Sequence, residues 1–77
     1  MEYLVTFYTH YGAMRFHKQC KREGAVSRLL PVPRALSASC GVCVRVEADA
    51  APKEAEHADL ESCYTTAPDG AYVIAEE

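Results

Sequence analysis

A helical pattern of apolar residues lies between two strand-like runs in the first half of the chain. Residues 3–9 are rich in β-branched and aromatic side chains, which predicts a strand at the centre of a sheet. The helical pattern that follows should begin near Thr9 or His10 and end at Gly24, and its stripe at i, i+3, i+4 and i+7 consists of Ala13, Phe16, His17 and Cys20. A strand joined through a helix to a second strand limits strongly the folds available to 77 residues.

The next two segments are also predicted to be strands. Residues 25–33 are apolar, and Pro31 and Pro33 lack N–H donors, so we expect this strand at a sheet edge. Valines at every second position over 42–46 indicate a strand with one apolar face.

The last third of the chain supports two interpretations. A second helix could begin at Pro52, and a helical stripe supports it with Leu60, Cys63, Tyr64 and Ala67. Residues 68–70 then form a turn, and 71–75 a final strand. The alternative makes 62–66 a strand that pairs with 71–75 as a hairpin, but the stripe favours the helix.

The order strand, helix, strand, strand, helix, strand predicts an α+β fold. It is the ferredoxin-like split βαβ arrangement, an antiparallel sheet with two helices on one face. The first and third strands would be central, and the other sheet face would be left for solvent, a partner or a second copy. We expect one domain over 1–77, with an acidic tail at 76–77.

Charge is divided unevenly along the chain. Residues 1–45 hold seven Lys or Arg and two Glu, for +5, whereas 46–77 hold one Lys and nine acids, for −8. A pI of about 5.5 argues against nucleic-acid binding, and no run of about 18 apolar residues predicts a membrane span. The acidic Glu2 does not suit a signal peptide, so we expect a cytoplasmic protein with reduced thiols.

Cys40 is the cysteine whose surroundings suit reactivity. Its neighbours Ser39 and Gly41 are small, so little side-chain bulk shields the sulfur. Arg34 and Arg45 flank the loop in sequence, and nearby positive charge favours the thiolate. The residues alone leave open that Cys40 is an ordinary loop cysteine and that the charges only form solvated surfaces.

The other cysteines support different interpretations. Cys43 completes a Cys-x-x-Cys with Cys40 and could act as a resolving thiol or as half of a redox pair, although a strand follows instead of the helix usual in redox motifs. Cys20 and Cys63 lie on the apolar stripes and are expected to pack as small hydrophobes. Structural zinc sites usually draw on two tight ligand pairs and this chain has one, so we expect no metal site. The sequence has no P-loop and no dinucleotide glycine fingerprint, and we expect no cofactor.

Several stretches of the chain together resemble one known family. They are Met1 to Tyr8, Ala13-Met14, Leu30-Pro31-Val32-Pro33-Arg34 and Leu36-Ser37-Ala38-Ser39-Cys40-Gly41. The family is that of small bacterial proteins labelled selenium/sulfur carrier-like, formerly a domain of unknown function. The resemblance covers nearly the whole chain, and the stretch from Pro31 to Gly41 is its specific part.

The resemblance implies that the chain moves sulfur or selenium as a cysteine-bound persulfide or selenosulfide. By position, only Cys40 matches the family's cysteine, and its matching surroundings are Pro31, Pro33, Arg34, Ser39 and Gly41. Cys43 departs from the family, because its strand position is usually apolar there.

The leading hypothesis is a carrier without enzymatic turnover of its own. Cys40 would take sulfur from a donor such as a cysteine desulfurase and pass it to an acceptor enzyme. Arg34 and Arg45 would stabilise the anionic sulfur, and Gly41 would let backbone N–H groups come close to it. Ser39 is the remaining predicted binding residue of the site. One alternative is a non-catalytic interaction module that binds a partner through its uncovered sheet face or an edge strand, with a homodimer through that face as one form. Another is a small redox protein that uses the Cys-x-x-Cys.

Overall fold

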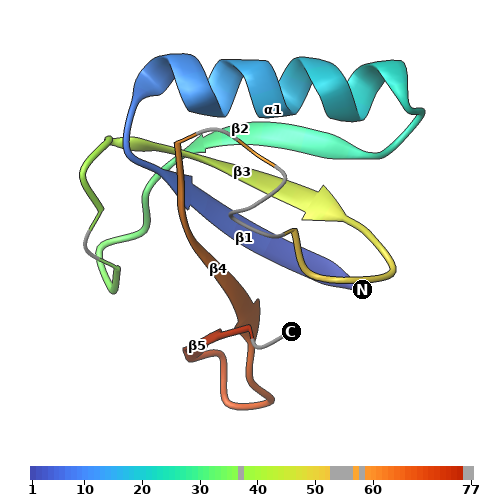
Figure 1. Ribbon diagram of the computed structural model, residues 1–77. Coiled ribbons are helices and arrows are strands. Elements are labelled where there is room, and N and C mark those ends of the chain that lie inside the picture. The colour runs from blue at the N-terminus through green and yellow to red at the C-terminus, as the bar shows by residue number, and fades with distance from the viewer. Residues whose placement is uncertain (37, 53–56, 58, 76–77) are drawn as a thin grey trace.

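Five strands and one helix make up the part of the chain that the computed structural model describes, namely residues 1–36, 38–52, 57 and 59–75. In chain order they are β1 (Glu2–Phe7), α1 (His10–Arg22), β2 (Ser27–Pro31), β3 (Val42–Glu47), β4 (Leu60–Thr66) and β5 (Tyr72–Ile74). All strand pairs are antiparallel, and the sheet order is β2-β3-β1-β4-β5. Figure 1 shows α1 lying along one face of this sheet.

The first half of the chain forms as predicted. Both β1 and β2 run antiparallel to β3, which lies between them, so β1, α1 and β2 form a split βαβ unit. β1 and β3 are central, and β2 with its terminal Pro31 lies at an edge, where a missing N–H donor does no harm.

Helix α1 buries its predicted stripe against the sheet. Its side chains Ala13, Phe16 and Cys20 are buried, and the Phe16 ring lies 5.4 Å from that of Phe7 on β1. The fourth stripe residue, His17, is only half-buried, because it lies at the edge of the helix face that contacts the sheet. Its Nδ1 is 2.7 Å from Ser27 Oγ. The strands complete this core with Tyr3, Val5, Phe7, Val44, Val46, Leu60 and Cys63.

Both ends of α1 follow from local sequence signals. Thr9 caps the helix, with its Oγ1 accepting a hydrogen bond from the Gly12 N–H at 3.0 Å. Gly24 follows the last turn with φ of 78°, a left-handed conformation that glycine adopts without strain. In the described residues no helix is both long and apolar enough to cross a membrane.

The favoured second helix over Leu60 to Ala67 is wrong, because this segment is strand β4. It pairs with β1 on one side and with β5 on the other, so the hairpin alternative over 62–66 and 71–75 is confirmed. A helix beginning at Pro52 would fall largely on 53–56 and 58, which lie outside the described residues. The architecture is therefore α+β, but the described part of the chain does not contain the second helix of the ferredoxin-like prediction.

An irregularity in β4 explains why its sequence looks helical. Thr6 pairs with Ser62, but the next residue of β1, Phe7, pairs with Leu60, so Glu61 is an extra residue in a β-bulge. The extra residue puts Leu60 and Cys63 on the same face of the sheet, where both are buried. A spacing of i and i+3 is normally a helical signal, and here it comes from a bulged strand.

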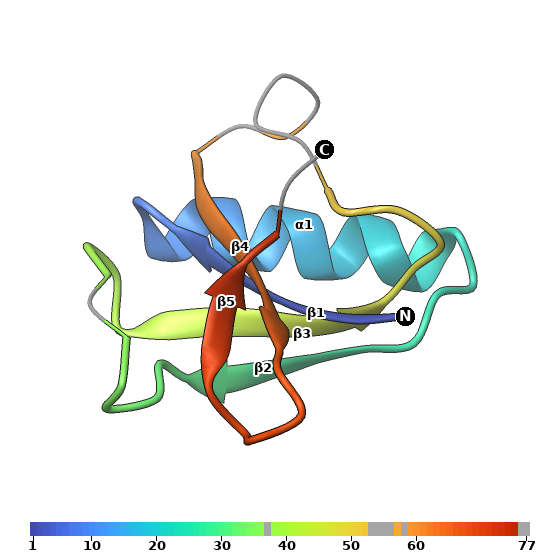
Figure 2. The same cartoon turned by 90° about the horizontal axis from the view of Figure 1, so that it is seen from below.

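The sheet face opposite α1 is less exposed than the sequence suggested. Leu4, Thr6 and Cys43 share this face by register, and all three are buried. Figure 2, which views the molecule from this side, shows β5 and the end of β4 crossing in front of β1 and β3. The β4–β5 hairpin thus bends toward the face opposite α1 instead of continuing the sheet flat.

Candidate functional site

Three segments that are distant in sequence meet at one end of the sheet. They are the loop between β2 and β3, the start of α1 and the start of β4, and both Figures 1 and 2 show them at the same end. The start of β4 is tied to α1 through Asp59, whose C=O accepts the Tyr8 N–H at 2.7 Å and whose carboxylate accepts from Thr9 Oγ1 at 2.9 Å.

Cys40 lies at this end of the sheet, in the loop that precedes β3. The loop is closed at its base, where the Val32 N–H donates to the Gly41 C=O at 3.0 Å. A turn after β2 is fixed by the Leu36 N–H donating to the Pro33 C=O at 3.0 Å. Cys40 is half-buried, whereas the other three cysteines are buried, and all four are thiols.

Ser39, next to Cys40, is bound to a residue that the sequence analysis did not single out. The Ser39 N–H donates to Glu61 Oε1 at 3.0 Å, and Ser39 Oγ donates to Glu61 Oε2 at 3.3 Å. Glu61 lies 22 positions farther along the chain, so no local sequence pattern could have joined the two. Both polar groups of Ser39 are therefore used by a carboxylate.

Gly41 leaves space beside Cys40. A Cβ placed on Gly41 would meet nothing within 4 Å, so the fold does not itself require glycine there. Gly41 also lines an open depression of about 400 Å³ whose other lining residues are His10, Leu29, Leu30, Pro31 and Val42. This depression brings His10, the first residue of α1, to the same surface as the cysteine loop.

The two arginines expected near the sulfur lie in different settings. Arg34 is exposed in the turn that follows β2. Arg45 lies on β3, where its Nε is 3.8 Å from the Glu2 carboxylate, with both side chains about half exposed. Of the predicted site residues, the structure groups Ser39, Cys40 and Gly41 in one loop and directs the Arg45 charge toward Glu2.

Cys43 is fully buried on the sheet face opposite α1. Its Sγ donates to the Pro31 C=O at 3.7 Å, which uses the thiol in its protonated form. Burial raises the pKa of Cys43, while Arg45 lowers it and a charge on Cys40 raises it further. The Cys-x-x-Cys therefore joins a half-buried thiol to a fully buried thiol whose pKa is raised.

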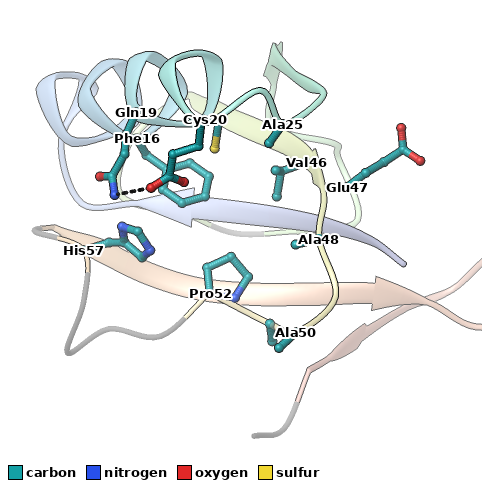
Figure 3. Close-up of a pocket in the computed structure, with 12 residues that line it drawn as sticks. Phe16, Gln19, Cys20, Ala25, Val46, Glu47, Ala48, Ala50, Pro52 and His57 are labelled. Atoms are coloured by element: carbon teal, nitrogen blue, oxygen red, sulfur yellow. Dashed lines mark hydrogen bonds between the residues drawn. The ribbon is translucent and has the colours of Figure 1, made fainter.

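Cys20 and Cys63 are packing residues, as predicted. Burial raises the pKa of Cys63 to about 11, and burial followed by the Glu23 charge raises that of Cys20. Cys20 also lines a cavity of about 390 Å³ at the far end of α1, where Figure 3 shows its sulfur pointing from the helix toward the sheet. His57 lies against this cavity, with its ring edge-on to Phe16 at 4.8 Å.

The comparisons with known proteins agree with the family expected from the sequence. Residues 2–61 match a family model described as "Putative Se/S carrier protein-like". The match includes the whole loop around Cys40 and extends to Glu61. Neither a curated protein nor a solved structure is found to be similar to this chain.

Proposed function

The chain belongs to the selenium/sulfur carrier-like family, and we propose that Cys40 carries a sulfur or selenium atom between a donor and an acceptor protein. The observation that carries this proposal is the contrast among its four cysteines. Cys40 is half-buried in a loop of small residues, whereas Cys20, Cys43 and Cys63 are buried and their pKa values are raised. A thiol that must meet a partner's sulfur needs both access and ionisation.

The proposed loading step is a thiol exchange. The Cys40 thiolate attacks the terminal sulfur of a donor persulfide, R–S–SH, and a new S–S bond forms. The donor's own S–S bond breaks, and its electron pair leaves with the donor sulfur as the thiolate R–S⁻. Cys40 is left as a persulfide, so charge and atoms balance and no external oxidant is needed. A donor selenosulfide would load selenium in the same way.

The residues around Cys40 would assist the exchange in different ways. Gly41 adds no side chain next to Cys40, and a Cβ at this position would meet nothing within 4 Å. Arg34, exposed in the same loop, would offer positive charge to the anionic sulfur. Arg45 would contribute only if it left Glu2. Cys43 could resolve the adduct only after local opening, because its thiol is fully buried.

The partners would be a sulfur or selenium donor, such as a cysteine desulfurase, and an acceptor enzyme. The depression that adjoins Gly41 would give either partner an apolar contact surface next to Cys40. In this role the chain binds and releases the atom and has no turnover of its own.

Intact-mass spectrometry tests the proposal directly. Wild type, Cys40→Ser and the control Cys20→Ala are incubated with a cysteine desulfurase and cysteine. We expect one or more added sulfur atoms on wild type and on Cys20→Ala, none on Cys40→Ser, and loss of the adduct with reductant. Wild type without an adduct, while the desulfurase is shown to be active, would contradict the carrier function.

A second candidate, a non-catalytic interaction module, is favoured by the exposed edge strand β5. Val73 and Ile74 on this strand are 49% and 64% exposed, and a sheet edge with apolar side chains can pair with another chain. Such a module should alkylate Cys40 no faster than a cysteine peptide does at the same pH. It should also form a dimer or a complex that survives Cys40→Ser.

A further inference from the structure

We propose that Glu61 is a positioning residue for Cys40, which it holds in place by anchoring the preceding residue, Ser39. The inference rests on the proposed role of Cys40, and it assigns a function to a side chain on a different strand. Its basis is the pair of hydrogen bonds from Ser39 to the Glu61 carboxylate, at 3.0 Å from the N–H and 3.3 Å from Oγ. Hydrogen bonds to a charged acceptor are stronger than neutral ones.

The bulge in β4 determines where the Glu61 carboxylate lies. Glu61 is the one residue of β4 between Leu60 and Ser62 that has no partner on β1, because Phe7 pairs with Leu60 and Thr6 with Ser62. A bulged residue leaves the alternation of the strand, and bulges commonly redirect a side chain next to a functional site. Here the redirected side chain reaches the loop before β3.

Cys40 is thereby held from both sides. On its N-terminal side Ser39 is bound to Glu61, and on its C-terminal side the Gly41 C=O accepts the Val32 N–H at 3.0 Å. The two anchors belong to β4 and to the end of β2, which lie on opposite sides of the central strands. The thiol therefore sits in a short bridge between two fixed points instead of at the tip of a free loop.

The anchor on β4 is itself fixed. Asp59, two residues before Glu61, is bonded through its C=O to Tyr8 and through its carboxylate to Thr9, the cap of α1. Its φ of 64° is a left-handed conformation that aspartate tolerates better than most residues. Ser39 is thus connected to the start of α1 through three consecutive residues, 59–61.

The experiment compares four variants with wild type. Glu61→Ala removes both hydrogen bonds, Ser39→Ala removes only the one from Oγ, and Glu61→Gln keeps an amide oxygen that can accept from the Ser39 N–H. Glu47→Ala is the matched control, an exposed carboxylate at the other end of the sheet. Amide hydrogen exchange of Ser39 by NMR and the rate of sulfur loading from the donor are measured in the same samples.

We expect Glu61→Ala to speed Ser39 exchange by about tenfold or more and to slow sulfur loading. Ser39→Ala and Glu61→Gln should have smaller effects than Glu61→Ala, because each keeps an acceptor for the N–H of residue 39, and Glu47→Ala should have no effect. Unchanged exchange in Glu61→Ala would overturn the anchor. Faster exchange in Glu61→Ala together with a wild type that accepts no sulfur would uphold the anchor and refute the carrier function.

Discussion

Iodoacetamide at about pH 8 should label Cys40 in the folded protein and leave the other three cysteines unlabelled. The reagent attacks the thiolate, so the rate at each site depends on the ionised fraction and on access to the sulfur. Cys20, Cys43 and Cys63 are buried, which limits access to their sulfurs, and their raised pKa values lower the fraction that is ionised.

The size of the effect can be worked out for Cys63. With a pKa of about 11, about one Cys63 thiol in 1,000 is ionised at about pH 8. An ordinary cysteine, with a pKa of about 8.5, is about one-quarter ionised at that pH. Ionisation alone therefore slows Cys63 by about 200-fold, and its burial slows it further, since the reagent reaches it only after local opening.

Peptide mapping after a short exposure measures all four sites at once. A sample treated in denaturant supplies the control, since unfolding should make the four rates similar. The reasoning fails if Cys43 or Cys63 is alkylated in the folded protein within about tenfold of the Cys40 rate. That result would mean that the face opposite α1, or the core beneath the helix, opens far more readily than the burial of these thiols indicates.

Three further predictions follow from the same contacts. Cys43→Ala should leave the amount of sulfur retained on Cys40 unchanged and lower the free energy of unfolding by about 1–2 kcal/mol; greater retention by mass spectrometry would instead identify Cys43 as a resolving thiol. The free energy of unfolding should fall as pH rises from about 8.5 to about 11, because unfolded thiols ionise first while the folded protein keeps Cys63 protonated, and denaturant titrations should show a smaller fall in Cys63→Ala. Thr9→Ala should destabilise the protein by about 1 kcal/mol through loss of the helix cap, whereas a midpoint equal to that of wild type would show that Asp59 and Tyr8 fix this end of the helix without it.

The elements with local patterns could be predicted from the sequence. α1 has an apolar stripe, a capping residue and a terminal glycine within 16 consecutive residues, 9–24, and all three signals act as expected. The central position of β1 and the edge position of β2 also follow from their own side chains. The exposure of Cys40 relative to Cys20 was predictable for the same reason, since small neighbours and an apolar helical stripe are both local features.

Features that depend on pairing between distant strands could not be predicted. Cys43 alternates with the valines of a strand predicted to have one apolar face, yet it is fully buried on the other face, which it shares with the buried Leu4 and Thr6. Arg45 is close to Cys40 in sequence, but its Nε lies 3.8 Å from the carboxylate of Glu2. The bond between Ser39 and Glu61 depends on the strand order, which no pattern within either segment encodes.

The bulge at Glu61 yields a final prediction, because deleting this one residue should change the loop around Cys40 and leave the fold unchanged. Without residue 61, Ser62 would still pair with Thr6 and Leu60 with Phe7, now as consecutive pairs of a regular ladder. Leu60 and Cys63 would then lie two positions apart, as residues on one face of a strand should. The deletion variant should therefore keep the sheet and its buried core.

The same deletion removes the carboxylate that holds Ser39, so the loop around Cys40 should lose one of its two anchors. Circular dichroism and thermal unfolding would report the fold, while Ser39 amide exchange and sulfur loading would report the site. We expect a folded protein with fast Ser39 exchange and slow loading. A deletion variant that does not fold would show that β4 needs the bulge in order to bend toward the face opposite α1. In that case the fold itself requires the extra residue, and Glu61 occupies a position that exists for a structural reason.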